Sequence, residues 1–276
     1  MPLTETEAHA LVAAVRDVAA AEIRPRFRNL HPGEVDAKRA FDDLVTVADT
    51  AAEAALTARV HDVLPGAAVL GEEAVAADAA VLDRVSAERC VVIDPIDGTW
   101  NFAHGIANYG VIVAVLEAGE TVWGLLYDPS FDDWIEAHRG GGAWFHRDGA
   151  RRRLTTDQGD ADPARMRGNL GEYLYPQADR PALAALAPNL RRATSLGASL
   201  HEYRQLATGG SDFCLNGMLN VWDHAAGVLV LQEAGGTSRL LDGTPYDPAM
   251  RAGRLLNARS PAVWDRMARL FGDALA

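Results

Sequence analysis

Two short apolar runs, residues 67–70 and 90–93, lead directly into acidic residues. Apolar runs of this length, bounded by turn signals, are typical of buried strands. The side chains of such strands are buried, and the acidic residues that come next in the sequence lie at the end of each strand. The pattern therefore predicts a mixed fold in which strands deliver acidic groups to a common site.

Helices and further strands are expected around these runs. Thr4 and Glu7 form a capping box that opens an amphipathic helix, and Pro25 ends it. A second helix is expected over residues 47–63, and residues 109–138 have the pattern of an antiparallel meander. Later segments are expected to form helix, strand, helix and strand at residues 199–207, 211–215, 223–234 and 237–241.

Residues 151–163 are polar and lack periodicity, and they mark the expected boundary between two halves. The N-terminal half, residues 1–150, is expected to be an α+β unit that carries the acidic turn described below. The C-terminal half, residues 151–276, is expected to be an α/β unit that supplies Asp223 and substrate contacts. At 276 residues and 49% hydrophobic, the chain can bury the core that such an arrangement needs.

The formal net charge of −12 repels nucleic-acid backbones and anionic membrane surfaces, so neither is an expected partner. An acidic protein that handles a phosphate needs positive charge, and bound metal ions supply it. Only Cys90 and Cys214 are present, without C-x-x-C spacing, which argues against a disulfide framework or a zinc cluster. No leader pattern and no apolar stretch of ~20 residues is found, and a cytoplasmic location is expected.

The central motif runs from Asp94 to Thr99, with the sequence DPIDGT, directly after the 90–93 run. Asp94 and Asp97 can converge on hard cations from one turn, and Gly98 permits an unusual backbone dihedral. Backbone amides after Gly98 can face a phosphate oxygen, and the Thr99 hydroxyl can bond a water on a metal. Taken alone, the segment is also compatible with an ordinary acidic turn that caps a helix.

Two other acidic segments accompany this motif. Glu72 and Glu73 follow the 67–70 run, and Asp223 stands at the expected start of an alanine-rich helix. Each alone is explained by a favourable position at the positive end of a helix or by an N-cap. Their joint occurrence with the central motif is what indicates a site.

Taken together, these segments resemble the inositol monophosphatase family of metal-dependent, lithium-sensitive phosphatases, and the resemblance spans almost the whole chain. The matching segments, in order, are DLVTVAD at 43–49, LGEEA at 70–74, DPIDGTWNF at 94–102, WDHAAG at 222–227 and EAGG at 233–236. The resemblance implies a layered αβαβα sandwich of mixed α+β and α/β type, as in inositol monophosphatases and fructose-1,6-bisphosphatases. It also implies a homodimer.

The resemblance further implies that two or three Mg²⁺ ions are bound. Glu72, Asp94 and the carbonyl of Ile96 would hold one ion, and Asp94, Asp97 and Asp223 would hold another. Carboxylate and carbonyl oxygens suit magnesium, whereas zinc more commonly recruits His or Cys. Paired divalent ions can stabilise both the attacking and the leaving oxygen of an in-line displacement.

Catalytic and substrate roles follow from the same resemblance. Thr99, with Glu72 and Asp49, would orient and polarise the attacking water. The residues implied in phosphate and substrate binding are Asp97, Gly98, Thr99, Gly197, Ala198, Asn216 and Asp223. A dehalogenase-type phosphatase, which would require D-x-D-G-T, is excluded at this motif because Pro95 stands where its first Asp would be.

The substrate half departs from the family pattern. The segment GASL at 197–200 stands where the family often has G-S-A-A, and Asn216 stands where inositol-selective members commonly place a Glu. Losing that carboxylate removes a strong hydroxyl acceptor. Inositol monophosphate, histidinol phosphate, 3′-phosphoadenosine 5′-phosphate and fructose 1,6-bisphosphate all stay open as substrates, and DGTWNF favours the inositol-type branch. A non-catalytic relative that binds a phosphorylated metabolite is the alternative from another class.

Overall fold

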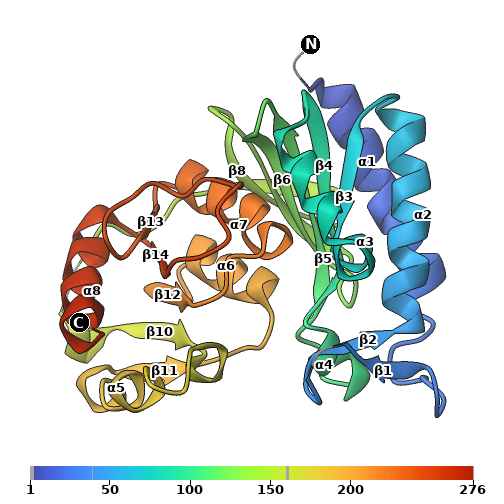
Figure 1. Ribbon diagram of the computed structural model, residues 1–276. Coiled ribbons are helices and arrows are strands. Elements are labelled where there is room, and N and C mark those ends of the chain that lie inside the picture. The colour runs from blue at the N-terminus through green and yellow to red at the C-terminus, as the bar shows by residue number, and fades with distance from the viewer. Residues whose placement is uncertain (1–2, 39, 160–161, 276) are drawn as a thin grey trace.

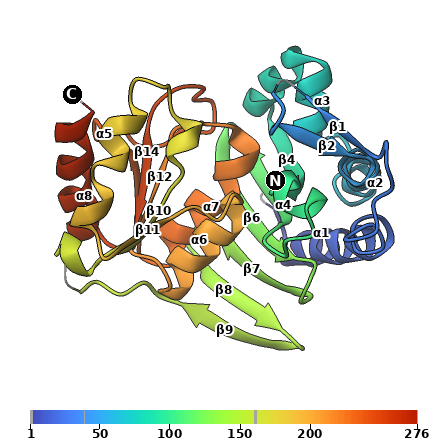
Figure 2. The ribbon, with the colours of Figure 1, turned by 90° about the horizontal axis from the view of Figure 1, so that it is seen from below.

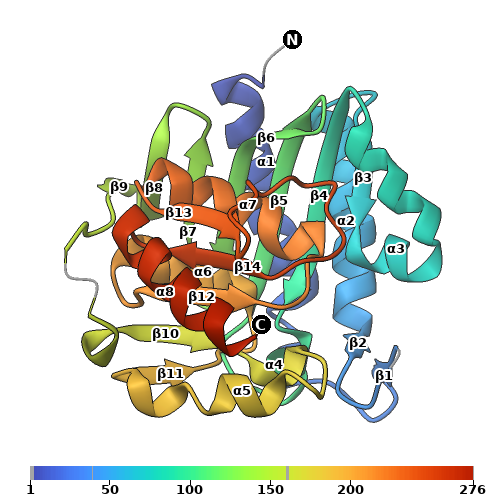
Figure 3. The same ribbon diagram turned by 60° about the vertical axis from the view of Figure 1, so that its left-hand side comes forward.

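The computed structural model describes residues 3–38, 40–159 and 162–275 (Figure 1). Its elements form five layers: two helices, a seven-stranded sheet, two central helices, a five-stranded sheet, and two outer helices (Figures 1 and 3). This is the layered, mixed sandwich expected from the sequence. None of the helices among the described residues has both the length and the apolar character needed to cross a membrane.

The seven-stranded sheet has the spatial order β3-β4-β5-β6-β7-β8-β9. Its strands are β3 (Ala68–Gly71), β4 (Arg89–Asp97), β5 (Gly110–Glu117), β6 (Glu120–Asp128), β7 (Asp133–His138), β8 (Gly142–Arg147) and β9 (Ala150–Leu154). Among the described residues of this sheet, only the β3–β4 pair is parallel. The meander predicted for residues 109–138 is confirmed, and it continues through β8 and β9, which extend beyond the covering helices (Figure 2).

Strand β4 runs through the acidic motif and ends at Asp97. The sequence pattern had predicted that this strand ends at residue 93. Its pairing with β5 shifts register, since Asp94 lies opposite Ile112 and Asp97 lies opposite Gly110. In a regular strand, residues three apart point to opposite faces. The extra residue of the bulge allows both carboxylates to turn to the same side.

Helices α1 (Glu5–Val18) and α2 (Val47–Val63) cover the outer face of this sheet. Both begin at capping boxes, at Thr4 and Thr46 respectively. The bounds predicted for the second helix, 47–63, are confirmed. A small hairpin of β1 (Val35–Ala37) and β2 (Leu44–Thr46) precedes α2, and α3 (Glu72–Ala77) follows β3.

The five-stranded sheet has the order β11-β10-β12-β14-β13. Its strands are β10 (Arg167–Leu170), β11 (Arg192–Thr194), β12 (Phe213–Asn216), β13 (Thr237–Leu240) and β14 (Leu255–Ala258). Strands β10, β11 and β12 are parallel, so their carboxyl ends meet at one edge of the sheet. Strands β10, β11 and β14 were not anticipated from the sequence.

The central layer consists of α6 (Ser199–Thr208) and α7 (Val221–Glu233). Helix α7 is buried on nearly all sides, because it lies between the two sheets. Gly227 allows α6 and α7 to approach closely, since a Cβ there would lie 2.2 Å from the ring of Tyr203. The other helical segments are α4 (Thr99–Ala103), α5 (Arg180–Ala184), α8 (Pro261–Ala274), the π-helical segment Ala19–Ile23 that continues α1, and the 3-10 segments Ala79–Ser86, Pro163–Arg165, Glu172–Leu174 and Ala187–Asn189.

Candidate metal centre and active site

Asp94, Asp97 and Asp223 converge where the end of β4 meets the first turn of α7. One carboxylate oxygen of each residue lies within 4.8 Å of the other two. Asp94 and Asp97 are buried, and Asp223 is half-buried. The bulge in β4 and the start of a helix from the far end of the chain thus bring three acidic groups to one point.

The chemistry of this group fits a divalent cation. Asp94 Oδ1 is buried without a hydrogen-bond partner. Burial, followed by the negative charge of neighbouring carboxylates, raises the pKa of both Asp94 and Asp97 well above the usual range. Burial raises the pKa of Asp223 to about 6. Oxygen donors are the ligands that Mg²⁺ prefers, and no His or Cys joins the group among the residues that the structure describes.

Asp97 is oriented by the first turn of α6. Its Oδ1 accepts a hydrogen bond from the backbone N–H of Ser199 at 3.1 Å, and its Oδ2 accepts one from Leu200 at 2.6 Å. Free N–H groups at a helix start favour a carboxylate. This contact ties the central motif to the C-terminal part of the chain.

Glu72 lies outside the tight group of three. Its Oε1 accepts a hydrogen bond from Lys38 Nζ at 2.8 Å, and Glu73 Oε1 accepts another from the same ammonium at 2.6 Å. Burial raises the pKa of Glu72 to about 7; the charges of Asp223 and Asp49 add to the increase, and Lys38 opposes it. Sequence analysis missed Lys38, which stands in a stretch without a motif or periodicity that would mark it.

Thr99 and Asp49 form a hydrogen-bonded pair beside the carboxylates. The Thr99 hydroxyl lies 3.1 Å from Asp49 Oδ1 and 3.0 Å from the carbonyl oxygen of Ile96. Asp49 is fully buried, which raises its pKa to about 6. Its Oδ2 accepts hydrogen bonds from both the N–H and the hydroxyl of Thr46. The capping box of α2 therefore fixes this carboxylate against Thr99.

The turn after β4 requires glycine. Gly98 has a φ of +85°, and a Cβ there would lie 2.8 Å from the carbonyl oxygen of Asn108 and 3.0 Å from Ala198 Cβ. The side-chain amide of Asn101 donates to the carbonyl oxygens of Leu196 and Asn108, both at 2.8 Å. Gly197 and Ala198, two of the predicted substrate residues, thus lie beside the turn.

Asn216 ends β12 and is held by its neighbours. Its Oδ1 accepts hydrogen bonds from Asn257 Nδ2 at 3.0 Å and from Cys214 Sγ at 3.3 Å. Its Nδ2 makes no hydrogen bond to any described residue. Cys214 also contacts the buried carboxylate of Glu202, at 3.1 Å.

These contacts belong to a polar network that consists of Glu202, Tyr203, Cys214, Asn216, His224 and Asn257. Asn257 Nδ2 lies 3.1 Å from the Tyr203 hydroxyl oxygen, and that hydroxyl lies 3.1 Å from His224 Nδ1. His224 Nε2 lies 2.7 Å from the carbonyl oxygen of Met218, so Nε2 carries the proton. Burial lowers the pKa of His224 to about 4 and keeps the ring neutral. The network thereby fixes the orientation of His224, which directly follows Asp223 in the sequence.

Known proteins are similar to this chain in sequence over most of its length. The model of the inositol monophosphatase family matches residues 4–274. The inositol-1-monophosphatase of Bacillus subtilis is 32% identical over 214 residues, which cover 77% of this chain and 78% of that protein. The fructose-1,6-bisphosphatase/inositol-1-monophosphatase of Thermotoga maritima is 30% identical over 210 residues, 75% of this chain and 76% of that protein.

A solved structure agrees in fold. An IMPase from Thermotoga maritima superposes with a TM-score of 0.80 at 23% sequence identity and covers 95% of both chains.

Proposed function

The chain belongs to the inositol monophosphatase family of phosphatases, and from this premise we propose that it is a magnesium-dependent hydrolase of a small phosphate monoester. The observation that carries the proposal is the convergence of Asp94, Asp97 and Asp223 within 4.8 Å, with an unpartnered buried oxygen on Asp94. Three ionised carboxylates this close together repel one another unless bound cations compensate their charge.

The residues that would hold magnesium are those that the sequence indicated. Asp94, Asp97 and Asp223 would bind one ion. Glu72 would join Asp94 and the Ile96 carbonyl at a second, through Oε2, because its Oε1 is bonded to Lys38. Bound divalent ions supply positive charge to the phosphate oxygens and acidify water.

The chain's own groups would position the reactants. Because Asp49 can accept the hydroxyl proton of Thr99, the Thr99 oxygen keeps lone pairs that can hold the attacking water. Glu72, which would also hold an ion, would help to orient and polarise that water. The amides of Gly98 and Thr99 would bind phosphate, and no covalent intermediate on the protein is needed.

Inositol monophosphate or a related polyol phosphate is the first substrate candidate, on the ground of kinship. Asn216 favours a second candidate, histidinol phosphate or 3′-phosphoadenosine 5′-phosphate. Its Oδ1 is already engaged twice, so Nδ2 is the group left to face a substrate. A donor at this point suits a ring nitrogen better than a hydroxyl that must itself donate.

Three further features are part of the proposal because the sequence implies them, the first two through its resemblance to the family: inhibition by lithium, a homodimeric assembly and a cytoplasmic location. Size-exclusion chromatography with light scattering tests the dimer, and a lithium titration of turnover tests the inhibition.

Phosphate release tests the proposed activity. It would be measured with and without magnesium on inositol 1-phosphate, histidinol phosphate, fructose 1,6-bisphosphate and 3′-phosphoadenosine 5′-phosphate, with Asp94→Asn as control. Magnesium-dependent turnover that the variant lacks is expected, and the preferred substrate would name the branch. Magnesium binding without turnover on any of them would favour a binding-only relative.

A further inference from the structure

Three arginines gather at one side of the five-stranded sheet, at the N-terminal ends of the edge strand β11 and of its neighbour β10. Arg167 and Arg192 lie directly opposite one another in the parallel pairing of β10 with β11, and Arg191 precedes Arg192. All three are exposed and line a cavity of about 420 Å³. We call them the arginine cluster.

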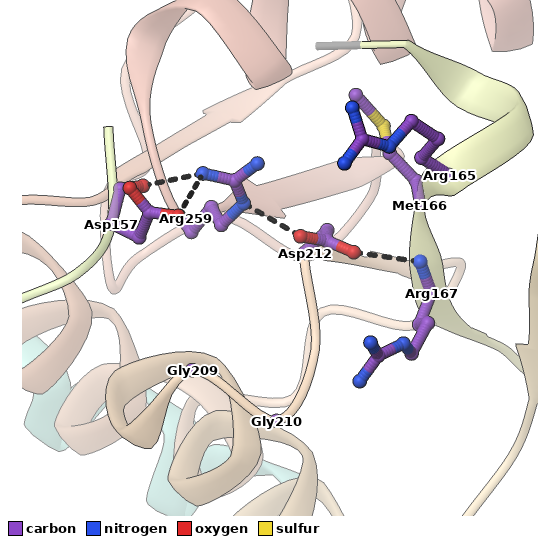
Figure 4. Close-up of a pocket in the computed structure, with 8 residues that line it drawn as sticks. All are labelled: Asp157, Arg165, Met166, Arg167, Gly209, Gly210, Asp212 and Arg259. Atoms are coloured by element: carbon purple, nitrogen blue, oxygen red, sulfur yellow. Dashed lines mark hydrogen bonds and ion pairs between the residues drawn. The ribbon is translucent and has the colours of Figure 1, made fainter. Parts of the chain in front are cut away.

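The guanidinium groups of the cluster have no hydrogen-bond or ion-pair partner within the described part of the chain. The neighbouring carboxylate, Asp212, is already engaged. Its Oδ1 accepts from Arg259 Nε at 2.6 Å, and its Oδ2 accepts from the backbone N–H of Arg167 at 2.7 Å. In Figure 4 the Arg167 guanidinium points away from Asp212.

An adjoining hollow of about 270 Å³ shows the contrast (Figure 4). There Arg259 is balanced by Asp212 and by Asp157, whose Oδ2 lies 3.5 Å away. The hollow is also lined by Gly209 and Gly210, at the C-terminal end of α6, which carries partial negative charge. Arg165 and Arg167 also line the hollow, so its charged residues sum to +1, whereas the arginine cluster carries +3 and no carboxylate. An anion is therefore drawn more strongly to the arginine cluster than to this hollow.

The cluster is costly without a ligand. Like charges directly opposite each other on neighbouring strands destabilise a sheet. The chain has 38 acidic residues against 26 basic ones, so carboxylate partners are not scarce in its composition. Leaving Arg167, Arg191 and Arg192 without one concentrates positive charge at one point of an otherwise acidic molecule.

The cluster is separate from the group of Asp94, Asp97 and Asp223, which we call the carboxylate site. Strands β10, β11 and β12 are parallel, and the arginines stand at their N-terminal ends. The loop with Gly197 and the residue Asn216 stand at the carboxyl ends, beside the candidate active site. The four residues of β10 span roughly 13 Å at ~3.3 Å per residue, so one ligand does not fill both places.

We propose that the arginine cluster binds a small anion that carries two or more phosphate groups. The planar fork of each guanidinium matches phosphate oxygens in pairs, and three of them outnumber what a single phosphate needs. A cavity of about 420 Å³ also lies within the size range of small-molecule sites. The site is distinct from the proposed phosphatase activity and does not depend on it.

Isothermal titration of the full chain with inorganic pyrophosphate tests the proposal. EDTA is present, because pyrophosphate chelates magnesium and because the metal-free carboxylate site repels anions. We expect saturable binding at one site, with inorganic phosphate at least about tenfold weaker. The double variant Arg167→Gln/Arg192→Gln should weaken pyrophosphate binding by about tenfold or more.

Arg266→Gln/Arg269→Gln is the matched control, since it removes the same charge from exposed positions on α8 and should leave the affinity unchanged. Thermal melting checks that both variants fold, and Arg191→Gln, outside the strand pairing, gives a second test if the double variant does not. Absence of saturable binding to the wild type would overturn the proposal. So would equal weakening in the control pair, or phosphate binding as tight as that of pyrophosphate.

Discussion

The carboxylate site and the polar network are neighbours in sequence and space, since Asp223 belongs to one and His224 to the other. They are built in opposite ways. In the carboxylate site, Asp94 Oδ1 is buried without a partner, and acidic groups with raised pKa values face each other. In the network, Asn216 Oδ1 accepts two hydrogen bonds, and each member has at least one partner, although Asn257 Oδ1 has none.

The difference shows which region needs a ligand. Buried polar groups that hydrogen-bond one another form a rigid wall, that is, a region that needs no ligand to satisfy its polar atoms. Buried like charges are tolerated only where something else compensates them. Removing a charge from the carboxylate site should therefore relieve the metal-free fold, whereas removing a member of the network should damage it.

Asp94→Asn should give the largest effect on activity. We expect turnover to fall by at least about a thousandfold, because metal ions supply several kcal/mol of transition-state stabilisation. Metal-free thermal stability should rise or stay level, since one repelling charge is gone. Asp128→Asn is the control: it alters a buried carboxylate of β6 outside the carboxylate site and should keep turnover. If the turnover of Asp94→Asn stayed within tenfold of wild type, the carboxylate site would not be the region that needs a ligand for activity.

Thr99→Val should come next. The change keeps the shape of the side chain and removes the hydroxyl bonded to Asp49. We expect kcat to drop by about a hundredfold, as for loss of a group that positions a proton transfer. Thr50→Val, on the exposed side of α2, should have no effect. An unchanged kcat, with magnesium binding intact in a melting assay, would remove Thr99 from the proposed machinery.

Asn257→Leu tests the other side of the comparison. It removes donors to Asn216 and Tyr203, and we expect the free energy of unfolding in urea to fall by roughly 1–3 kcal/mol. The exposed Asn189→Leu serves as the control. If Asn257→Leu were as stable as wild type, the network would not be the rigid wall described here.

Asn216→Asp should give the smallest change. It replaces the free Nδ2 donor with an acceptor. We expect the kcat/KM ratio of inositol 1-phosphate to histidinol phosphate to rise by about tenfold, because an acceptor suits a hydroxyl and rejects a ring nitrogen. An unaltered ratio would mean that Asn216 does not contact the leaving group.

Local signals explain what the sequence predicted well. The bounds of α2 were predicted from the apolar spacing of Leu56, Val60 and Val63, which acts within neighbouring turns, and the structure adds the capping box at Thr46. The layered fold and the family follow from motifs whose residues are adjacent in sequence. The convergence of Asp94 with Asp223 was expected only through the resemblance, because no local rule places α7 against β4.

The features that the sequence did not predict depend on tertiary context. Lys38 gains its place only when the β1–β2 hairpin brings it to Glu72, so no spacing rule could mark it. The bulge in β4 was hidden because the apolar run stops at residue 93 while the ladder continues. Strand β9 was missed because its arginines give no alternating apolar pattern.

Thermal melting of the chain, with and without saturating magnesium, at about pH 5 and about pH 8 is the most direct test of the central claim. Burial raises the pKa values of Glu72 to about 7 and of Asp49 and Asp223 to about 6, from ordinary values of 4.5 and 3.8. The folded state therefore binds protons more tightly than the unfolded state. These groups should destabilise the metal-free fold increasingly as pH rises through this window, and magnesium should replace the lost protons. The account predicts a magnesium-induced rise in melting temperature that is larger at about pH 8; no rise at either pH, or a larger one at about pH 5, would contradict it.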